Sequence, residues 1–535
     1  MKDMNPEIWR SLYTGRTDVS NFNYLVRQVS QPESRGAFHF GSRQFHRRHT
    51  AHELQRVPQD ALERCETGLE LRLLRAYFDR VNLGWPIVDE EHFMAQYQGK
   101  DVQNPLMLPL LNAILLVGAH VLGGSDKSVA QLQATFFRRA KTLIDCRYEQ
   151  DRTMYVQVAL LLTWYSDGHE EIVANAWHWI GFAIRIAIGH GMHRDVTHSK
   201  LLPVHRRSWT RLWWILFQFD TTVSAAYGRP QTLNLDESDV PDLEPAHFQG
   251  IPKAQVDFAM HHAKLCTIFA EVMKKRWALR SSTQERIQAS RQADEALAEF
   301  IINLPPSLKL SFSRLSPWTA TLHLTYNNFV LLLHRPPPLA MDEVAVACQD
   351  STLCGAATAA MSSIFETICH HCDASTLWLY SVHAMFTALI QVSNELTSPN
   401  PIVVARSQII FDTLMDALKY LSNYWQFAEN ILRLFKQRGE YLIQDAAKTS
   451  KPDVESFTLR PPPLAPSAET TSWENITDGN VTLCPGRESV STKAVSCSPW
   501  QSDTDLHMDE LMMEEFPDSF ALELFLAGMD GSTQD

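Results

Sequence analysis

Residues 206–241 read RRSWTRLWWILFQFDTTVSAAYGRPQTLNLDESDVP, and this stretch decides the fold. From position 209 to 224 nearly every residue is large and apolar, which predicts a helix buried inside a globular domain. Its polar stripe is Arg211, Gln218 and Thr222, at steps of seven and four residues. A Gly-Arg-Pro turn ends the predicted helix, and an acidic extended segment follows it.

One carboxylate, Asp220, lies away from that stripe, on the apolar face of the predicted helix. An unpaired buried charge is very costly, so Asp220 needs a partner. Arg229 in the following turn or Arg185 in an upstream apolar helix could supply it. We interpret this group as a structural lock and not as a catalytic group, because buried ion pairs perturb pKa values without doing chemistry.

Length and composition indicate a large protein of the cell interior. A chain of 535 residues suggests about two to four structural units. The N-terminus has no apolar core of a secretory signal, and the longest apolar run, residues 106–122, is too short and too polar for a bilayer span. The nine cysteines show no disulfide-like spacing, which favours a reducing compartment. We therefore expect no membrane segment.

The net charge of −13 is unevenly distributed. No Lys or Arg follows Lys493, whereas ten Asp or Glu residues do. The rest of the chain is only slightly acidic, which argues against a broad phosphate-binding surface.

Helical periodicity dominates the chain between its ends. Apolar residues recur at threes and fours, and we find no convincing alternation of the strand type. The predicted helices are 69–81, one beginning at Asp89, 108–121, 134–146, 154–165, 176–188, 209–224, 258–278, 285–304, 318–333, further helices within 351–397, and 404–446. The fold class is therefore all-α: a multi-helix domain at residues 61–447, preceded by a partly irregular lead-in at residues 1–60.

Several motifs carry a family resemblance. They are Arg206-Arg207, Trp213-Trp214, Asp220, Gly228-Arg229-Pro230 and the run down to Asp239-Val240-Pro241. Together they resemble the regulatory middle region of fungal zinc-cluster transcription factors, and the similarity extends closely over about residues 60–245. The resemblance implies a nuclear regulator, possible homodimerisation, and a middle region that restrains or licenses activation.

Members of that family usually read DNA through an N-terminal module in which six cysteines hold two zinc ions. Before Cys146 this sequence has only Cys65, so no such module can be built from it. Zinc is therefore expected only for a module outside this chain, and the chain itself needs no cofactor. Either the sequence is truncated, or it is a zinc-free co-regulator that reaches DNA through a DNA-binding partner.

The C-terminal part has two compositions. Residues 448–501 are rich in Ser, Thr and Pro, which predicts a disordered linker. Residues 502–535 alternate acids with bulky apolar groups, a pattern typical of activation segments that recruit a coactivator or the transcription machinery. The candidate contact residues are Leu511, Phe516, Phe520, Leu524 and Phe525. The alternatives are a tail that docks on its own globule and an inert acidic solubiliser.

Catalytic motifs are weak. Asp89-Glu90-Glu91-His92 invites comparison with the Mg²⁺-binding acids of terpene cyclases, but three consecutive acids point around a helix, and no second acidic motif follows. A solvated first helical turn explains them better. Cys369-His370-His371-Cys372 offers one CxxC pair without a second. We therefore predict no catalytic and no metal-binding residues, with an all-α Mg²⁺-dependent enzyme as the alternative.

Overall fold

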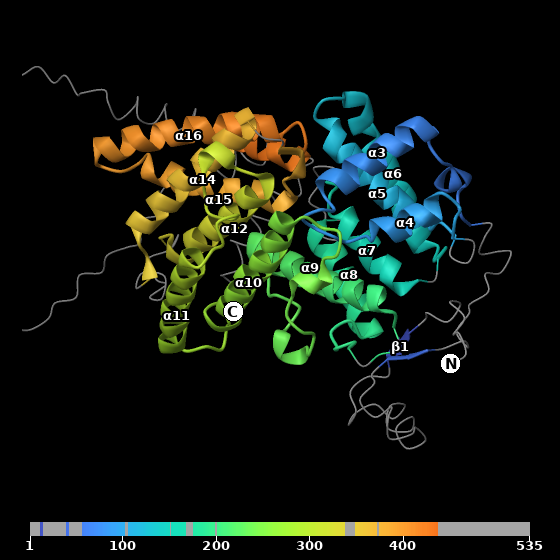
Figure 1. The fold of residues 1–535 in the computed structure, drawn as a ribbon. Helices are drawn as coiled ribbons and strands as arrows, with labels where there is room; N and C mark the ends of the chain where they lie inside the picture. Colours follow the sequence, from blue (N-terminus) through green and yellow to red (C-terminus); the bar gives the residue numbers. More distant parts are fainter. Residues whose placement is uncertain are drawn as a thin grey trace, which may run out of the picture. The chain divides into compact units, whose positions relative to one another are not determined.

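The computed structural model describes residues 11–13, 39–41, 56–101, 105–149, 151–166, 175–197, 199, 201–336, 348–371 and 374–436. The regular secondary structure of these residues is almost entirely helical, which confirms the all-α prediction (Figure 1). The exception is a short antiparallel ladder between β1 (Ser11–Tyr13) and β2 (His39–Gly41). The predicted linker, the activation tail and the boundaries at residues 447 and 501 lie outside the described residues and stay predictions.

An apolar helix, α5 (Leu108–Gly123), lies at the centre of several of the helices before position 200. The helices of this part are η3 (Gln59–Leu62), α3 (Thr67–Arg80), α4 (Glu90–Tyr97), α5, α6 (Lys127–Asp145), α7 (Arg152–Leu162) and α8 (Ala176–His190). α5 is buried along nearly its whole length and packs against α3, α6 and α7. α6 begins earlier than predicted, because Asp126 caps it by accepting hydrogen bonds from the backbone N–H groups of Ser128 and Val129.

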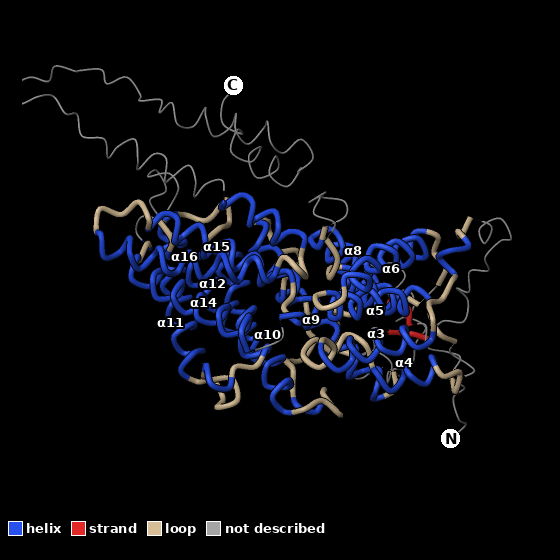
Figure 2. The backbone as a smooth tube through the Cα atoms, turned by 90° about the horizontal axis from the view of Figure 1, so that it is seen from above, coloured by secondary structure: helices blue, strands red, loops and turns tan. Residues whose placement is uncertain are grey.

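α9 (Pro203–Tyr227) contains the predicted apolar helix, and every residue from 209 to 224 is buried. Gly228, with a φ of 60°, ends it in the left-handed conformation that glycine adopts without strain. α9 contacts α8 on one side and α10 and α15 on the other, so it lies between the earlier and the later helices (Figure 2). The predicted burial and the predicted helix stop are both confirmed.

The later elements form the rest of the helical unit. They are η4 (Leu235–Glu237), η5 (Pro245–His247), α10 (Lys253–Lys275), α11 (Thr283–Ile302), η6 (Phe312–Arg314), α12 (Pro317–His334), α14 (Ser351–His371), η7 (Ala374–Thr376), α15 (Leu379–Glu395) and α16 (Pro401–Leu421). α12 packs against α10, α14 and α15, and α16 packs against α14 and α15. Among the described helices, α14 alone is long and apolar enough to cross a bilayer, but core helices meet the same criteria, and α14 packs within this bundle.

Aromatic side chains join the two sets of helices through α9. The ring of Phe219 meets Trp85 edge-on at 5.2 Å between centroids and stacks on Trp378 at 3.9 Å. Trp85 precedes α4, and Trp378 precedes α15. One residue of α9 is thus packed between segments that are almost 300 positions apart in the chain, which explains why α9 has to be apolar all round.

The stretch predicted as helical over residues 404–446 is interrupted once in the structure, and residues 437–446 lie outside the described residues. α16 ends at Leu421, and a second helical stretch begins at position 426. The side chains of Ser422 and Asn423 bond the carbonyls of Lys419 and Tyr420, which satisfies the end of α16. Trp425 then turns into the core, where its Nε1 donates to the carbonyl of Leu377 at 3.1 Å.

Candidate functional site

Asp220 is the buried carboxylate of α9, with 2 % of its surface exposed. Its Oδ2 accepts hydrogen bonds from the backbone N–H groups of Thr232 at 3.0 Å and Leu233 at 2.7 Å. The hydroxyl of Ser224 lies 3.5 Å from Oδ1. Burial raises the pKa of Asp220 to about 7, although the two amide hydrogen bonds oppose that rise. Asp220 therefore holds the backbone of residues 232–233 against α9.

The partners predicted for Asp220 are wrong. The guanidinium of Arg229 lies 4.4 Å above the ring of Trp177 and 5.5 Å from that of Tyr227, and Arg185 is exposed on α8. After the turn at Gly228 the chain runs back along α9, so the amides of Thr232 and Leu233 donate to the Asp220 carboxylate. Arg229 can then keep its charge near solvent and stack on aromatic rings.

The acidic segment after the turn is bonded to the loop after α8. Arg194 donates from Nε and Nη2 to the two carboxylate oxygens of Asp239, at 3.0 and 2.8 Å. The backbone N–H of Asp195 donates to the same carboxylate at 2.6 Å. Burial raises the pKa of Asp239, but the bonds from Arg194 and Asp195 outweigh it and lower that pKa overall. On α9, Trp214 donates from its indole to the carbonyl of Pro241 at 2.9 Å.

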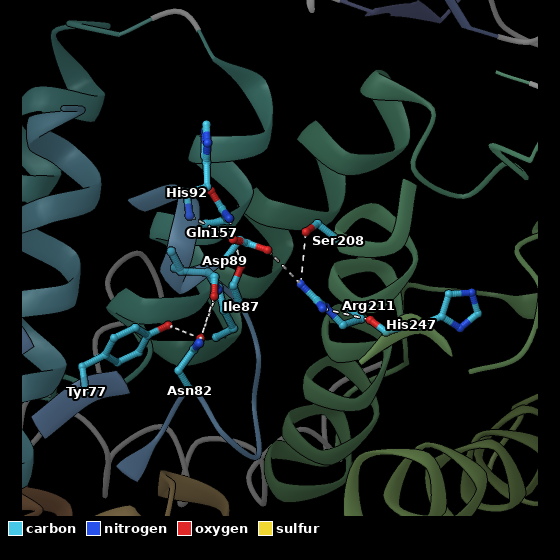
Figure 3. A network of polar contacts seen from close by, with 10 residues as sticks. Tyr77, Asn82, Ile87, Asp89, His92, Gln157, Ser208, Arg211 and His247 are labelled. Carbon is cyan, nitrogen blue, oxygen red and sulfur yellow. Dashed lines mark hydrogen bonds and ion pairs between the residues drawn. The ribbon is translucent and has the colours of Figure 1, made fainter. Parts of the chain in front are cut away.

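In the first half of α9, Arg211 is a buried cation whose side chain is 7 % exposed. Nη1 donates to the carbonyl of His247 at 2.9 Å, and Nη2 donates to the hydroxyl of Ser208 at 3.1 Å. Nη2 also lies 3.9 Å from the carboxylate of Asp89, which precedes α4 (Figure 3). Burial lowers the pKa of Arg211 and Asp89 counteracts it, but an arginine stays charged at neutral pH.

Asp89 makes two contacts, one to the start of α4 and one to Arg211. Its Oδ1 accepts from the backbone N–H of His92 at 3.0 Å, which caps α4, while Oδ2 faces Arg211. In the part of the chain that the structure describes, no group of three or more His, Cys, Asp or Glu side chains is placed to hold a metal ion. The geometry thus gives no support to the Mg²⁺-dependent alternative. Our sequence reasoning missed the ion pair, because Asp89 and Arg211 are far apart in the chain.

The segment that positions Asp89 is held by an asparagine. Oδ1 of Asn82 accepts from the hydroxyl of Tyr77 at 2.8 Å and from the N–H of Val88 at 3.1 Å. Its Nδ2 donates to the carbonyl of Val88 at 2.9 Å. Gln157, on α7, donates to the neighbouring carbonyl of Ile87 at 2.9 Å (Figure 3). The turn that presents Asp89 to α9 is therefore rigid.

A third polar contact lies in the middle of α9. Nδ1 of His262, on α10, lies 2.8 Å from Oε1 of Gln218, and Nε2 lies 3.3 Å from the hydroxyl of Thr325 on α12. Gln218 also donates to the carbonyl of Trp214 at 2.9 Å. Burial lowers the pKa of His262 to about 3, so the imidazole is neutral at physiological pH. This contact links α9, α10 and α12.

The remaining motif residues occupy structural positions around α9. Trp213 and Trp214 are buried. Arg206 donates to the carbonyl of Thr197 at 2.6 Å, Arg207 is half-buried, and Pro230 is exposed beside Gly228. The five candidate tail residues, Leu511, Phe516, Phe520, Leu524 and Phe525, lie outside the described residues.

Comparison with known proteins places these motifs in a family. Residues 74–290 match the family described as the fungal specific transcription factor domain. The chain is 43 % identical over 432 residues to an acetamidase regulatory protein of Aspergillus oryzae, covering 80 % of this chain and 55 % of that protein. It is 42 % identical over 449 residues to an acetamidase regulatory protein of Emericella nidulans, covering 83 % and 55 %.

A more distant relative is cutinase transcription factor 1 alpha of Fusarium vanettenii, which is 32 % identical over 391 residues, 68 % of this chain and 42 % of that protein. The chain spans about half the length of the curated relatives it matches. The matched residues run from α3 into α11 and have α9 and its polar contacts near their centre. The match over residues 74–290 agrees with the resemblance read from the motifs: this part of the chain is similar to the fungal specific transcription factor domain.

Proposed function

We propose that this chain acts in the nucleus as a transcriptional regulator that works by recruitment. The observation that carries the proposal is the family match of the helical domain, joined in one chain to an acidic, apolar tail. In such tails charge keeps bulky apolar groups in solvent, where a coactivator or the transcription machinery can bind them. Leu511, Phe516, Phe520, Leu524 and Phe525 are the contact residues we propose.

The helical domain would act as a scaffold in this mechanism. Asp220, Arg211 and Gln218 on α9 all bond other side chains or the main chain, which suits a rigid support for protein contacts. DNA would be reached through a zinc module outside this sequence, or through a DNA-binding partner or a second copy. The similarity to acetamidase regulatory proteins makes an acetamidase promoter the first DNA to test.

A reporter assay tests recruitment. The full chain is fused to an unrelated DNA-binding domain, and Phe520, Leu524 and Phe525 are replaced together by Ala. We expect reporter output to fall to the level of the DNA-binding domain alone, because the apolar contacts are lost while the acids remain. Replacing Ser532, Thr533 and Gln534 by Ala is the matched control and leaves output unchanged. Full output from the Phe520, Leu524 and Phe525 variant would refute recruitment by the tail.

A further inference from the structure

Six times in the described part of the chain, an arginine is followed by a threonine three residues later. Many protein kinases select substrates by this spacing, because acidic groups of the kinase bind the arginine while the threonine hydroxyl lies at the catalytic base. Both side chains must therefore be exposed and free of other partners. The pairs are Arg64–Thr67, Arg139–Thr142, Arg194–Thr197, Arg207–Thr210, Arg229–Thr232 and Arg280–Thr283.

In three of these pairs a carboxylate already binds the arginine. An arginine in such an ion pair has to give up its partner before a kinase can bind it. Thr197 is engaged as well, because its hydroxyl donates to the carboxylate of Asp195 at 2.6 Å. The ion pairs are Arg64 with Glu70, Arg139 with Glu63 and Arg194 with Asp239.

Two further pairs lie partly inside the fold. Thr210 is 3 % exposed, and its hydroxyl donates to the carbonyl of Arg206 at 3.2 Å. Arg229 is half-buried, with its guanidinium 4.4 Å from the centre of the Trp177 ring. Neither pair offers an accessible arginine together with an accessible hydroxyl.

The sixth pair, Arg280 and Thr283, belongs to the turn between α10 and α11. Both residues are exposed, and in the described part of the chain neither side chain has a hydrogen-bond or ion-pair partner. Leu279, the residue before Arg280, is 95 % exposed, so the turn is open to solvent. The neighbouring hydroxyl of Ser282 is engaged instead, because it donates to the carboxylate of Glu285 at 2.9 Å and caps α11.

The position of Thr283 suits binding to a kinase, which holds its substrate as an extended segment. Thr283 is the first residue of α11, and residues 276–282 before it lie outside the helices. Its backbone N–H is one of those that a helix start leaves without an intrahelical acceptor. Helix ends open at little cost in free energy, so residues 280–284 can extend while the domain stays folded.

We propose that Thr283 is a phosphorylation site for a protein kinase that recognises arginine three residues before its acceptor. The reaction moves the γ-phosphoryl group of a nucleoside triphosphate to Oγ1 of Thr283. The bond from the γ-phosphorus to its bridging oxygen breaks, and a bond from phosphorus to Oγ1 forms. The hydroxyl proton passes to the catalytic base of the kinase, and the nucleoside diphosphate leaves. This inference does not depend on the acidic tail or on recruitment.

Phosphorylation would reverse the charge of the turn. Residues 279–284 carry one charge, that of Arg280, and a phosphothreonine adds about −1.5 to −2. The added charge lies at the start of α11, where the helix dipole and the N–H groups of the first turn favour an anion. The modification is therefore compatible with the fold, and it adds negative charge beside the exposed side chain of Leu279.

Thr67 supplies a matched comparison within the chain. Like Thr283, it is exposed and is the first residue of a helix, with an arginine three residues before it. The two sites differ because Arg64 is bound to the buried carboxylate of Glu70. Freeing Arg64 costs the kinase a charged hydrogen bond, so we expect Thr283 to be phosphorylated at least about tenfold faster than Thr67.

Phosphorylation of the purified full chain tests the proposal. The chain is incubated with magnesium, adenosine triphosphate and the catalytic subunit of cyclic-AMP-dependent protein kinase, which is arginine-directed, and mass spectrometry locates the phosphate. Arg280→Gln should lower the rate at Thr283 about tenfold, because the kinase loses its charged contact. Arg291→Gln is the matched control and leaves that rate unchanged, since Arg291 is exposed on α11 but lies outside the recognised segment. Thr283→Val removes the phosphate and confirms its position.

Equal rates at Thr283 and Thr67 would overturn the proposal, because a free arginine would then confer no advantage. So would a rate at Thr283 that Arg280→Gln leaves unaltered. A third contrary result is an unmodified Thr283 in a reaction where the same kinase phosphorylates an added arginine-containing standard peptide. Since the substituted positions are exposed, folding should persist in every variant, which circular dichroism checks.

Discussion

The two halves of α9 bury opposite charges by different means. Asp220 is bonded to amides 12 and 13 residues further along the chain. Arg211 is bonded to a carbonyl 36 residues further along the chain and faces Asp89. Five helices separate Asp89 from Arg211 in the sequence. The first arrangement fixes the segment after Gly228, and the second links Asp89, the residue before α4, to α9. Their contributions to stability should therefore differ in size and in pH dependence.

The largest expected difference between Asp220 and Arg211 is in how the stability that each contributes changes with pH. The pKa of Asp220 is raised from 3.8 to about 7, so the folded state binds a proton that the unfolded state releases. The stability from this group is present below about pH 4 and is lost as pH rises towards 7, about 4 kcal/mol in all. Asp220→Asn should abolish that loss, whereas Arg211→Met should leave it intact. Urea unfolding of the full chain at several pH values measures both differences.

The control is to subtract the unfolding free energies of Asp220→Asn from those of the unaltered chain at each pH. The subtraction is needed because buried histidines also titrate. Burial lowers the pKa values of His120, His262 and His383 to about 3, so these groups remove stability as pH falls below about 6.5. Both proteins share them, and their effect cancels in the difference. A flat difference between pH 4 and 7 would contradict a raised pKa for Asp220.

A smaller effect is expected from removing the Asp220 side chain at pH 5.5, where its carboxyl is neutral. Asp220→Ala leaves the amides of Thr232 and Leu233 without their acceptor, which should cost about 2–3 kcal/mol. Asp220→Asn keeps an acceptor oxygen in place and should cost less than half as much. Equal losses of stability for Ala and Asn in urea unfolding would show that the hydrogen bonds from Thr232 and Leu233 to Asp220 contribute little to stability.

The local pattern of the sequence was enough to predict α9. The apolar run from 209 to 224 and the glycine at 228 fix its burial and its end, since both depend on neighbouring residues. The cap of α6 at Asp126 was readable in the same way, but the prediction began that helix too late. The break after Leu421 depends on Trp425 reaching the carbonyl of Leu377, a tertiary contact that helical periodicity does not contain.

The candidate site was predicted only in part. The burial of Asp220 followed from its position on an apolar face, but its partners follow from the path of the chain after Gly228. The sequence showed Arg211 as a polar residue in an apolar helix. A single sequence does not reveal that the fold brings Asp89 close to it. The resemblance to a family supplied the proposed function, because the described side chains around α9 hold helices and loops together and do not by themselves indicate an activity.

The smallest expected effect is the coupling between Arg211 and Asp89. Asp89→Ala removes the cap of α4, worth about 1 kcal/mol, and leaves the buried Arg211 without its nearest anion. Asp126→Ala on α6 is the matched control, since it removes a similar cap without a buried arginine. Asp89→Ala should therefore be the more destabilising of the two in urea unfolding.

Arg211→Met completes a double-mutant cycle with Asp89→Ala. Asp89 keeps 32 % of its side chain exposed, and the 3.9 Å separation is long for an ion pair, so we expect a coupling of about 0.5–1 kcal/mol. Asp89→Ser retains the cap and should lose only this coupling. A coupling near zero would reduce Asp89 to a helix cap, and the carbonyl of His247 and the hydroxyl of Ser208 would then be the groups that hold the cation in α9.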